Sequence, residues 1–172
     1  VDGKPRDLAQ FGVMGAVYME KVMGTKAPKV ALINNGAEEH KGNDLTQKAH
    51  QMLKKMPIDF TGNVEARDLV SGETDVAVAD GFVGNVVLKF MEGFASALMS
   101  MLKTEMTSTF RSKMGAALTM PSLKNFKKTM DYTEYGGAPP LGVHKAIVKA
   151  HGSSSSQAVS HALPNCTPRC MG

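Results

Sequence analysis

Apolar residues along this chain form two patterns, short continuous runs and longer stretches with helical spacing. Runs that end in polar residues and glycine predict buried strands over residues 29–34, 58–64, 75–79 and 145–150. Helical spacing predicts helices over residues 5–24, 44–55, 84–106 and 153–163. Residues 107–130 are interpreted as a helix–break–helix, with the break between Gly115 and Pro121.

Strands and helices therefore alternate along the chain. This alternation predicts an α/β fold with a mostly parallel sheet between helices, a three-layer α/β/α arrangement. Right-handed crossovers place the strand-to-helix loops at one edge of such a sheet, where ligands bind. The polar residues of these loops are the site candidates: Glu38, Glu39, Lys41, Asn43, Asn63, Glu65, Arg67, Asp80, Asn85, His151 and Ser153.

The loop at residues 36–43 has features of an anion site. Its glycines permit close backbone approach, a helix N-terminus follows, and Lys41 adds a positive charge. Glu38 and Glu39 would repel a phosphate unless they are paired. The alternative is a turn before a helix whose dipole the two glutamates complement.

Residues 80–85 join a predicted buried strand to an apolar helix. Asn85 can cap that helix or offer its amide to a ligand, and Lys89 shares the same helix face. A lysine on so apolar a helix needs a partner or a route to solvent. The alternative is a capping motif beside a solvated lysine.

His151 follows the last predicted strand, and Ser153 opens the helix after it. Histidine is an acid–base group near neutral pH, and a serine-capped helix start can bind an oxyanion. The alternative is a structural histidine. His40, His50 and His161 are interpreted as solvent-exposed, and the histidines lack metal-ligand spacing. We therefore predict no metal site.

The chain has 172 residues, of which 42% are apolar, so residues 1–163 are expected to form one domain, followed by an atypical tail at 164–172. The two cysteines, both in that tail, form no disulfide framework, which favours a reducing cytoplasm. No uninterrupted apolar run reaches the ~18 residues of a membrane-spanning helix. The opening residues resemble a loop inside a longer protein, and we expect no signal peptide.

The net charge of +4 does not by itself separate an anionic substrate, a nucleic acid and an anionic membrane. However, residues 106–130 contain basic and apolar residues and no acidic ones, which is typical of membrane-surface helices. At about 1 kcal/mol per basic residue, the attraction is a few kcal/mol and sensitive to salt. The alternative is a solvated hairpin packed on a partner subunit. Because aromatic residues are scarce, nucleic acid is not an expected partner.

Four blocks, at residues 35–43, 62–68, 79–89 and 131–154, together resemble the phosphate acyltransferases of bacterial phospholipid synthesis. The fourth block includes Glu134 to Pro139 and His151 to Ser153. The resemblance extends over about residues 1 to 160. Family members are roughly twice as long, so the chain corresponds to a C-terminal half and the N-terminal half of the fold is missing.

The resemblance implies transfer of a fatty acyl group from acyl carrier protein to inorganic phosphate, giving acyl phosphate. It implies a fold similar to the isocitrate and isopropylmalate dehydrogenases, without a nicotinamide or other cofactor. It also implies a cytoplasmic homodimer in peripheral contact with an anionic membrane through residues 107–130. The residues expected to make that contact are Phe110, Arg111, Lys113, Leu118, Met120, Leu123, Lys124, Lys127 and Lys128.

For this reaction the site needs donors for phosphate and for the tetrahedral oxyanion, and a proton for the leaving thiol. The predicted catalytic residues are His151, Lys89 and Asp80. The predicted phosphate-binding residues are Glu39, Lys41, Asn43, Asn85 and Ser153. Two alternatives remain: a phosphate acetyl- or butyryltransferase acting on acyl coenzyme A, and an inactive fragment that dimerises and binds membrane.

Overall fold

The computed structural model describes residues 3–130 and 140–143, with side chains described as far as Pro121 and again over 140–143. The elements, in chain order, are α1 (Pro5–Lys21), β1 (Lys29–Asn34), α2 (Asp44–Leu53), β2 (Asp59–Glu65), the 3₁₀ helix η1 (Ala66–Ser71), β3 (Val76–Val78), α3 (Gly81–Thr107) and α4 (Phe110–Met130). The predicted strand at 145–150, the helix at 153–163, the tail, and the candidates His151 and Ser153 lie outside the described residues.

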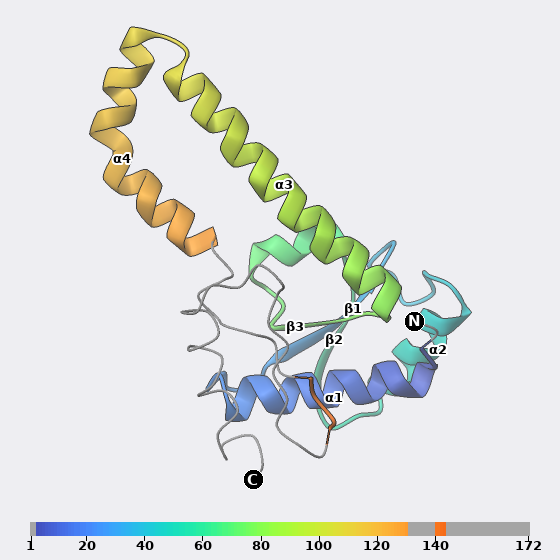
Figure 1. Ribbon diagram of the computed structural model, residues 1–172. Coiled ribbons are helices and arrows are strands. Elements are labelled where there is room, and N and C mark those ends of the chain that lie inside the picture. Colours follow the sequence, from blue (N-terminus) through green and yellow to red (C-terminus); the bar gives the residue numbers. More distant parts are fainter. Residues whose placement is uncertain (1–2, 131–139, 144–172) are drawn as a thin grey trace.

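The three strands form a parallel sheet in the order β2-β1-β3 (Figure 1). The chain moves from β1 sideways to β2, and then back across β1 to β3. The two connections, one through α2 and one through η1, thus run in opposite directions across the sheet. Because both crossovers are expected to be right-handed, α2 and η1 lie on opposite faces of the sheet. The α/β fold with helices on both faces is thereby confirmed, as part of a three-layer arrangement.

The core lies between the sheet and the pair α1 and α2. It consists of Leu8, Ala9, Ala16, Val30, Leu32, Ala49, Leu53 and Val78. Small residues on α1 allow close packing: a Cβ on Gly12 would lie 2.6 Å from Leu53 Cδ2 on α2, and one on Gly15 would lie 2.6 Å from Val76 Cγ1 on β3. This packing fixes α2, and with it the loop that follows β1.

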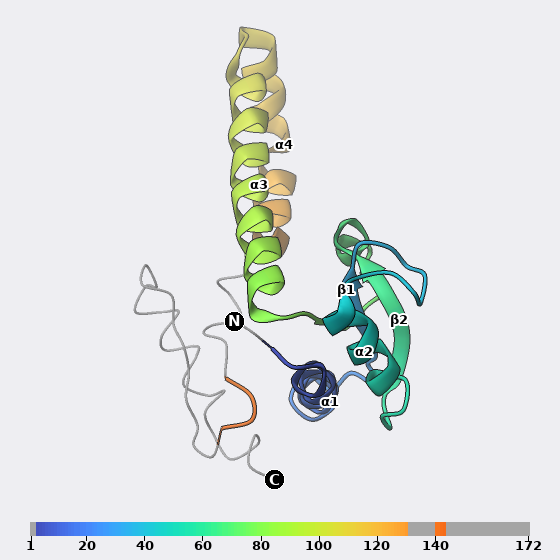
Figure 2. The same ribbon diagram turned by 90° about the vertical axis from the view of Figure 1, so that its right-hand side faces the viewer.

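Helices α3 and α4 run side by side in opposite directions and extend away from the sheet (Figures 1 and 2). We call this pair the α3–α4 arm. The predicted break between Gly115 and Pro121 is wrong, because α4 is continuous and the turn lies at Ser108 and Thr109.

Hydroxyl groups explain where that turn lies. Ser108 Oγ donates to the carbonyl of Glu105 at 2.8 Å and closes α3, whereas Thr109 Oγ1 accepts from the amide of Ser112 at 3.1 Å and opens α4. Pro121 removes one helical hydrogen bond without ending the helix.

The surface of α3 is strongly apolar. None of its residues is buried, and by length and composition it is able to cross a membrane, contrary to the expectation that no segment is. That expectation counted uninterrupted apolar residues. In α3 the apolar stretch is interrupted by Lys89 and Glu92, which pair with each other at 2.7 Å. A partner chain or the rest of a larger fold can equally cover such a helix.

Candidate functional site

The loop after β1, residues 35–43, is held by side-chain amides from three elements. Asn34 Nδ2 donates to the carbonyl of Lys41 at 3.0 Å, and Asn63 Nδ2 donates to that of Glu38 at 2.8 Å. Gln47 Nε2 donates to the carbonyls of His40 and Gly42, at 2.7 and 3.2 Å. The strand β1, the strand β2 and the helix α2 therefore all hold carbonyl groups of this loop.

The direction of these carbonyls determines where the loop's amides point. In a trans peptide the C=O and the following N–H point in opposite directions. With the carbonyls of Glu38, Lys41 and Gly42 directed toward the three side chains, the N–H groups of Glu39, Gly42 and Asn43 are directed away from them. Neighbouring backbone N–H groups that face outward suit an anion.

Two glycines make this loop possible. Gly42 has a φ of +96°, and a Cβ there would lie 2.5 Å from Asn34 Oδ1. A Cβ on Gly36 would lie 2.9 Å from Lys41 Cγ, so the stem of Lys41 passes over Gly36. Among the residues that the structure describes, Lys41 Nζ has no ion-pair partner. The carboxylate of Glu38 lies beside this stem, because its Oε2 is 2.8 Å from the same Cβ position on Gly36.

Glu39 is paired, which answers the objection that its charge would repel phosphate. Its carboxylate accepts from Gln51 Nε2 at 2.8 Å and lies 3.2 Å from Lys54 Nζ. The hydrogen bond from Gln51 and then the contacts with Lys54 hold the pKa of Glu39 below its usual value. Gln51 lies on α2 and Lys54 is the C-cap residue of that helix, so Glu39 fastens the loop to the end of α2.

Two predicted site residues, one from the phosphate-binding set and one from the catalytic set, serve as helix caps. Asn43 Oδ1 accepts from the amide of Thr46 at 3.0 Å and caps α2. Asp80 Oδ1 accepts from the amides of Phe82 and Val83, at 2.8 and 3.0 Å, and caps α3. Asn85, the residue predicted as a possible cap, instead lies exposed as the fifth residue of α3. Capping explains why these short polar side chains occur where strands lead into helices.

The remaining candidate cations are engaged locally. Lys89 Nζ lies 2.7 Å from Glu92 on the next turn of α3. Arg67 Nε lies 3.1 Å from Glu65, at the end of β2. These pairs leave Lys41 as the candidate whose charge best fits an anion at the edge of the sheet.

His50 is not solvent-exposed as predicted: only 5% of it is accessible. It lies on the inner face of α2, and its Nδ1 is 3.0 Å from Asn63 Oδ1 on β2. The sequence signal was its spacing, one residue after Ala49 and three before Leu53, both fully buried. Asn34, Gln47 and His50 were missed as parts of the site.

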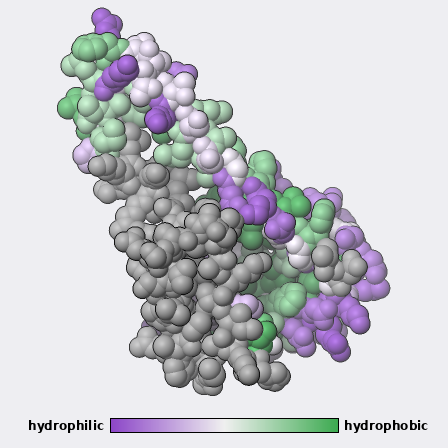
Figure 3. All heavy atoms as spheres, in the orientation of Figure 1, coloured by the Kyte–Doolittle hydropathy of each residue, from purple (hydrophilic) through white to green (hydrophobic). Residues whose placement is uncertain are grey.

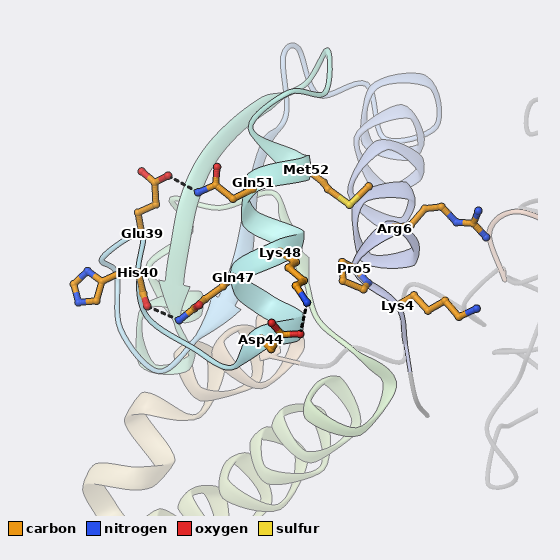
Figure 4. Close-up of a pocket in the computed structure, with 10 residues that line it drawn as sticks. All are labelled: Lys4, Pro5, Arg6, Glu39, His40, Asp44, Gln47, Lys48, Gln51 and Met52. Atoms are coloured by element: carbon orange, nitrogen blue, oxygen red, sulfur yellow. Dashed lines mark hydrogen bonds and ion pairs between the residues drawn. The ribbon is translucent and has the colours of Figure 1, made fainter.

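An open groove of about 960 Å³ lies between the start of α1 and α2 and borders the loop at residues 35–43 (Figure 4). It is lined by Lys4, Pro5, Arg6, Glu39, His40, Asp44, Gln47, Lys48, Gln51 and Met52. Lys4 and Arg6 point away from α2 in Figure 4, and Lys48 pairs with Asp44 at 2.7 Å. Because neither Lys41 nor Asp80 lines it, the groove is not where the candidate residues meet.

Comparison with known proteins gives consistent matches over nearly the whole chain. Residues 1–167 match a family described as fatty acid synthesis protein. The phosphate acyltransferase of Brevibacillus brevis is 52% identical over 167 residues, covering 97% of this chain and 50% of that protein. Those of a Geobacillus strain and of Alkaliphilus oremlandii are 53% and 52% identical, covering 95% and 93% of this chain. The chain spans about half the length of these curated relatives.

Proposed function

Because this chain belongs to the fatty acid synthesis protein family, we propose that it forms one half of an enzyme that moves a fatty acyl group from acyl carrier protein to inorganic phosphate. The identity of 52–53% with phosphate acyltransferases over 93–97% of the chain carries this proposal. The product would be an acyl phosphate, used in phospholipid synthesis. A chain of half the relatives' length is expected to supply one side of the reaction cleft.

In this reaction a phosphate oxygen attacks the thioester carbonyl, the carbon–sulfur bond breaks, and the leaving thiolate takes a proton. Lys41 and the outward-facing amides of residues 39, 42 and 43 suit the phosphate, because charge-assisted and backbone donors stabilise its oxygens. Asn43 and Asp80 would act by capping the helices beside the site. His151 remains the predicted proton donor, outside the described residues.

The phosphate role of Lys41 can be tested in an enzyme in which this chain is joined to the first half of the Brevibacillus brevis phosphate acyltransferase. We expect Lys41→Ala to raise the KM for phosphate about 10-fold or more, since a hydrogen bond to a charged group contributes about 1.5–3 kcal/mol. Acyl-phosphate formation from acyl carrier protein is the measurement.

Lys55→Ala is the control, because Lys55 is an exposed lysine that lies beyond the other end of α2. Equal KM values for the Lys41 and Lys55 variants would exclude Lys41 from phosphate binding. Turnover with acetyl or butyryl coenzyme A but not with acyl carrier protein would favour the smaller-substrate class of enzyme instead.

We also propose that the α3–α4 arm makes peripheral contact with an anionic membrane, and that the enzyme is a homodimer. Phe110 and Leu118 are 77% and 84% exposed, Met120 is 46% exposed, and Arg111 and Lys113 are exposed beside them. Green apolar surface covers much of the arm in Figure 3. The other expected contacts, Leu123, Lys124, Lys127 and Lys128, lie on α4, where their side chains are not described. We propose a cytoplasmic, peripherally membrane-associated location, as the resemblance implies.

A further inference from the structure

The buried histidine of α2 has a defined hydrogen-bonding direction. Asn63 donates through Nδ2 to the carbonyl of Glu38, so its Oδ1 is the atom that faces His50. An amide oxygen only accepts hydrogen bonds, and the contact therefore assigns a proton to His50 Nδ1. A continuous chain of donors runs from His50 through Asn63 to the loop, with successive distances of 3.0 and 2.8 Å.

Both sides of the His50 ring are constrained. Its Nε2 lies 4.0 Å from Glu39 Oε1, and the ring meets Phe60 edge-on, with centroids 5.0 Å apart and an interplanar angle of 76°. A Cβ on Gly62 would lie 4.0 Å from His50 Cε1, so β2 closes over the ring. His50 thus contacts the loop in two ways, through Asn63 to the backbone of Glu38 and across a short gap to the carboxylate of Glu39.

We propose that His50 is a positioning residue that sets the peptide between Glu38 and Glu39 and so aims the amide of Glu39 at the bound anion. It acts through Asn63, and it does not touch the substrate. The identity of the anion as phosphate rests on the proposed function, whereas the ordering of the loop does not.

The chemistry of the ring explains why an apolar side chain would not serve. With leucine at position 50, Asn63 Oδ1 would lose its donor in a partly buried place, which carries a penalty of desolvation. The side-chain amide of Asn63 would then be free to turn, and the carbonyl of Glu38 would lose its partner. Asparagine at position 50 retains a donor close to the place of Nδ1.

The ordering of the loop is measured in the joined enzyme by amide hydrogen exchange. The reporter is the amide of Lys41, which donates to the carbonyl of Glu38 at 3.0 Å. For His50→Leu we expect this amide to exchange about 10-fold faster relative to those of β1, and for His50→Asn to stay near the wild-type rate. If His50→Leu does not fold, His50→Gln replaces it, because glutamine moves the donor toward the place of Nε2. Equal acceleration of loop and β1, or no rescue by asparagine, would overturn the proposal.

The effect on the anion is measured in the joined enzyme by a double-mutant cycle of His50→Leu and Asn63→Ala. Each variant is expected to raise the KM for phosphate about 5- to 10-fold with kcat within about 2-fold, and the double variant to be no worse than either. Additive effects, or a fall in kcat alone, would contradict positioning through Asn63. If the wild-type enzyme forms no acyl phosphate, the proposed function fails, while hydrogen exchange still decides the role of His50.

Discussion

At the scale of single residues, the candidate site consists mainly of side chains that hold backbone. The sequence correctly placed polar residues after β1, β2 and β3, because strand ends in a parallel sheet are predictable. It could not tell a ligand-binding Asn43 or Asp80 from a capping one, since the same short polar group suits both. The link between His50 and Asn63 depends on how closely β2 lies beside α2, which no local pattern specifies.

Glu39 gives a prediction for pH dependence. Its lowered pKa in the folded chain means that its ionisation stabilises the fold above the pKa of the unfolded chain, and that this contribution is lost as pH falls through the folded value. Wild type is therefore expected to be more stable than Glu39→Gln near neutral pH, with the two converging in acid. Urea unfolding of wild type and Glu39→Gln, at neutral and at acidic pH, measures this difference in stability.

The control for that measurement is Glu20→Gln, because Glu20 is paired with its exposed neighbour Lys21 on the surface of α1. The difference for Glu39 is expected to be small, since its carboxylate is half exposed and water screens the pair. A difference between wild type and Glu39→Gln that persists unchanged in acid would show that ionisation of Glu39 does not stabilise the fold.

At the scale of elements, local pattern predicted most of the described structure. The strand at 29–34 is confirmed to the residue, and those at 58–64 and 75–79 to within one residue at each end. The helix η1 was missed, because six residues without apolar periodicity give little signal. The predicted helix end at 106 lies one residue before the end of α3. The break predicted between Gly115 and Pro121 is wrong because these residues are strong breakers in isolation, whereas helix pairing stabilises α4 through both.

The packing of α1 on α2 gives a prediction for Gly12, with a glycine on the exposed helix α3 as the comparison. Gly12→Ala is expected to lower the free energy of unfolding by about 1–3 kcal/mol, because the new methyl group would meet Leu53 in a filled core. Gly93→Ala, on α3 with nothing within 4 Å, is expected to raise it by about 0.5–1 kcal/mol. Urea denaturation of both variants is the measurement, and a stabilising Gly12→Ala would show that α1 can move away from α2.

At the scale of the whole molecule, two parts differ in character: a small sheet with its helices, and the α3–α4 arm. The sequence predicted the apolar helix and the basic segment separately. Their pairing into an arm was not predictable, because it depends on the contact between α3 and α4 rather than on the pattern of either helix. The basic residues Arg111 and Lys113 lie in the first turns of α4, beside the turn that joins the two helices.

The arm gives a prediction for membrane binding. We expect the chain to co-sediment with anionic vesicles in low salt and less in high salt, because basic residues are attracted to the surface and salt screens them. Combining Phe110→Ser with Leu118→Ser is expected to reduce binding at both salt concentrations. Val70→Ser is the control, since Val70 is 75% exposed but lies on η1. Equal binding by all variants would contradict contact through α4.

The sheet order has a consequence for handling the protein. With β1 in the centre, β2 and β3 each leave one side without a strand partner among the described residues. Unpaired strand edges are templates for association with other chains. Self-association of this chain is therefore expected to increase with its concentration, and making the complementary half in the same cell is expected to increase the soluble yield.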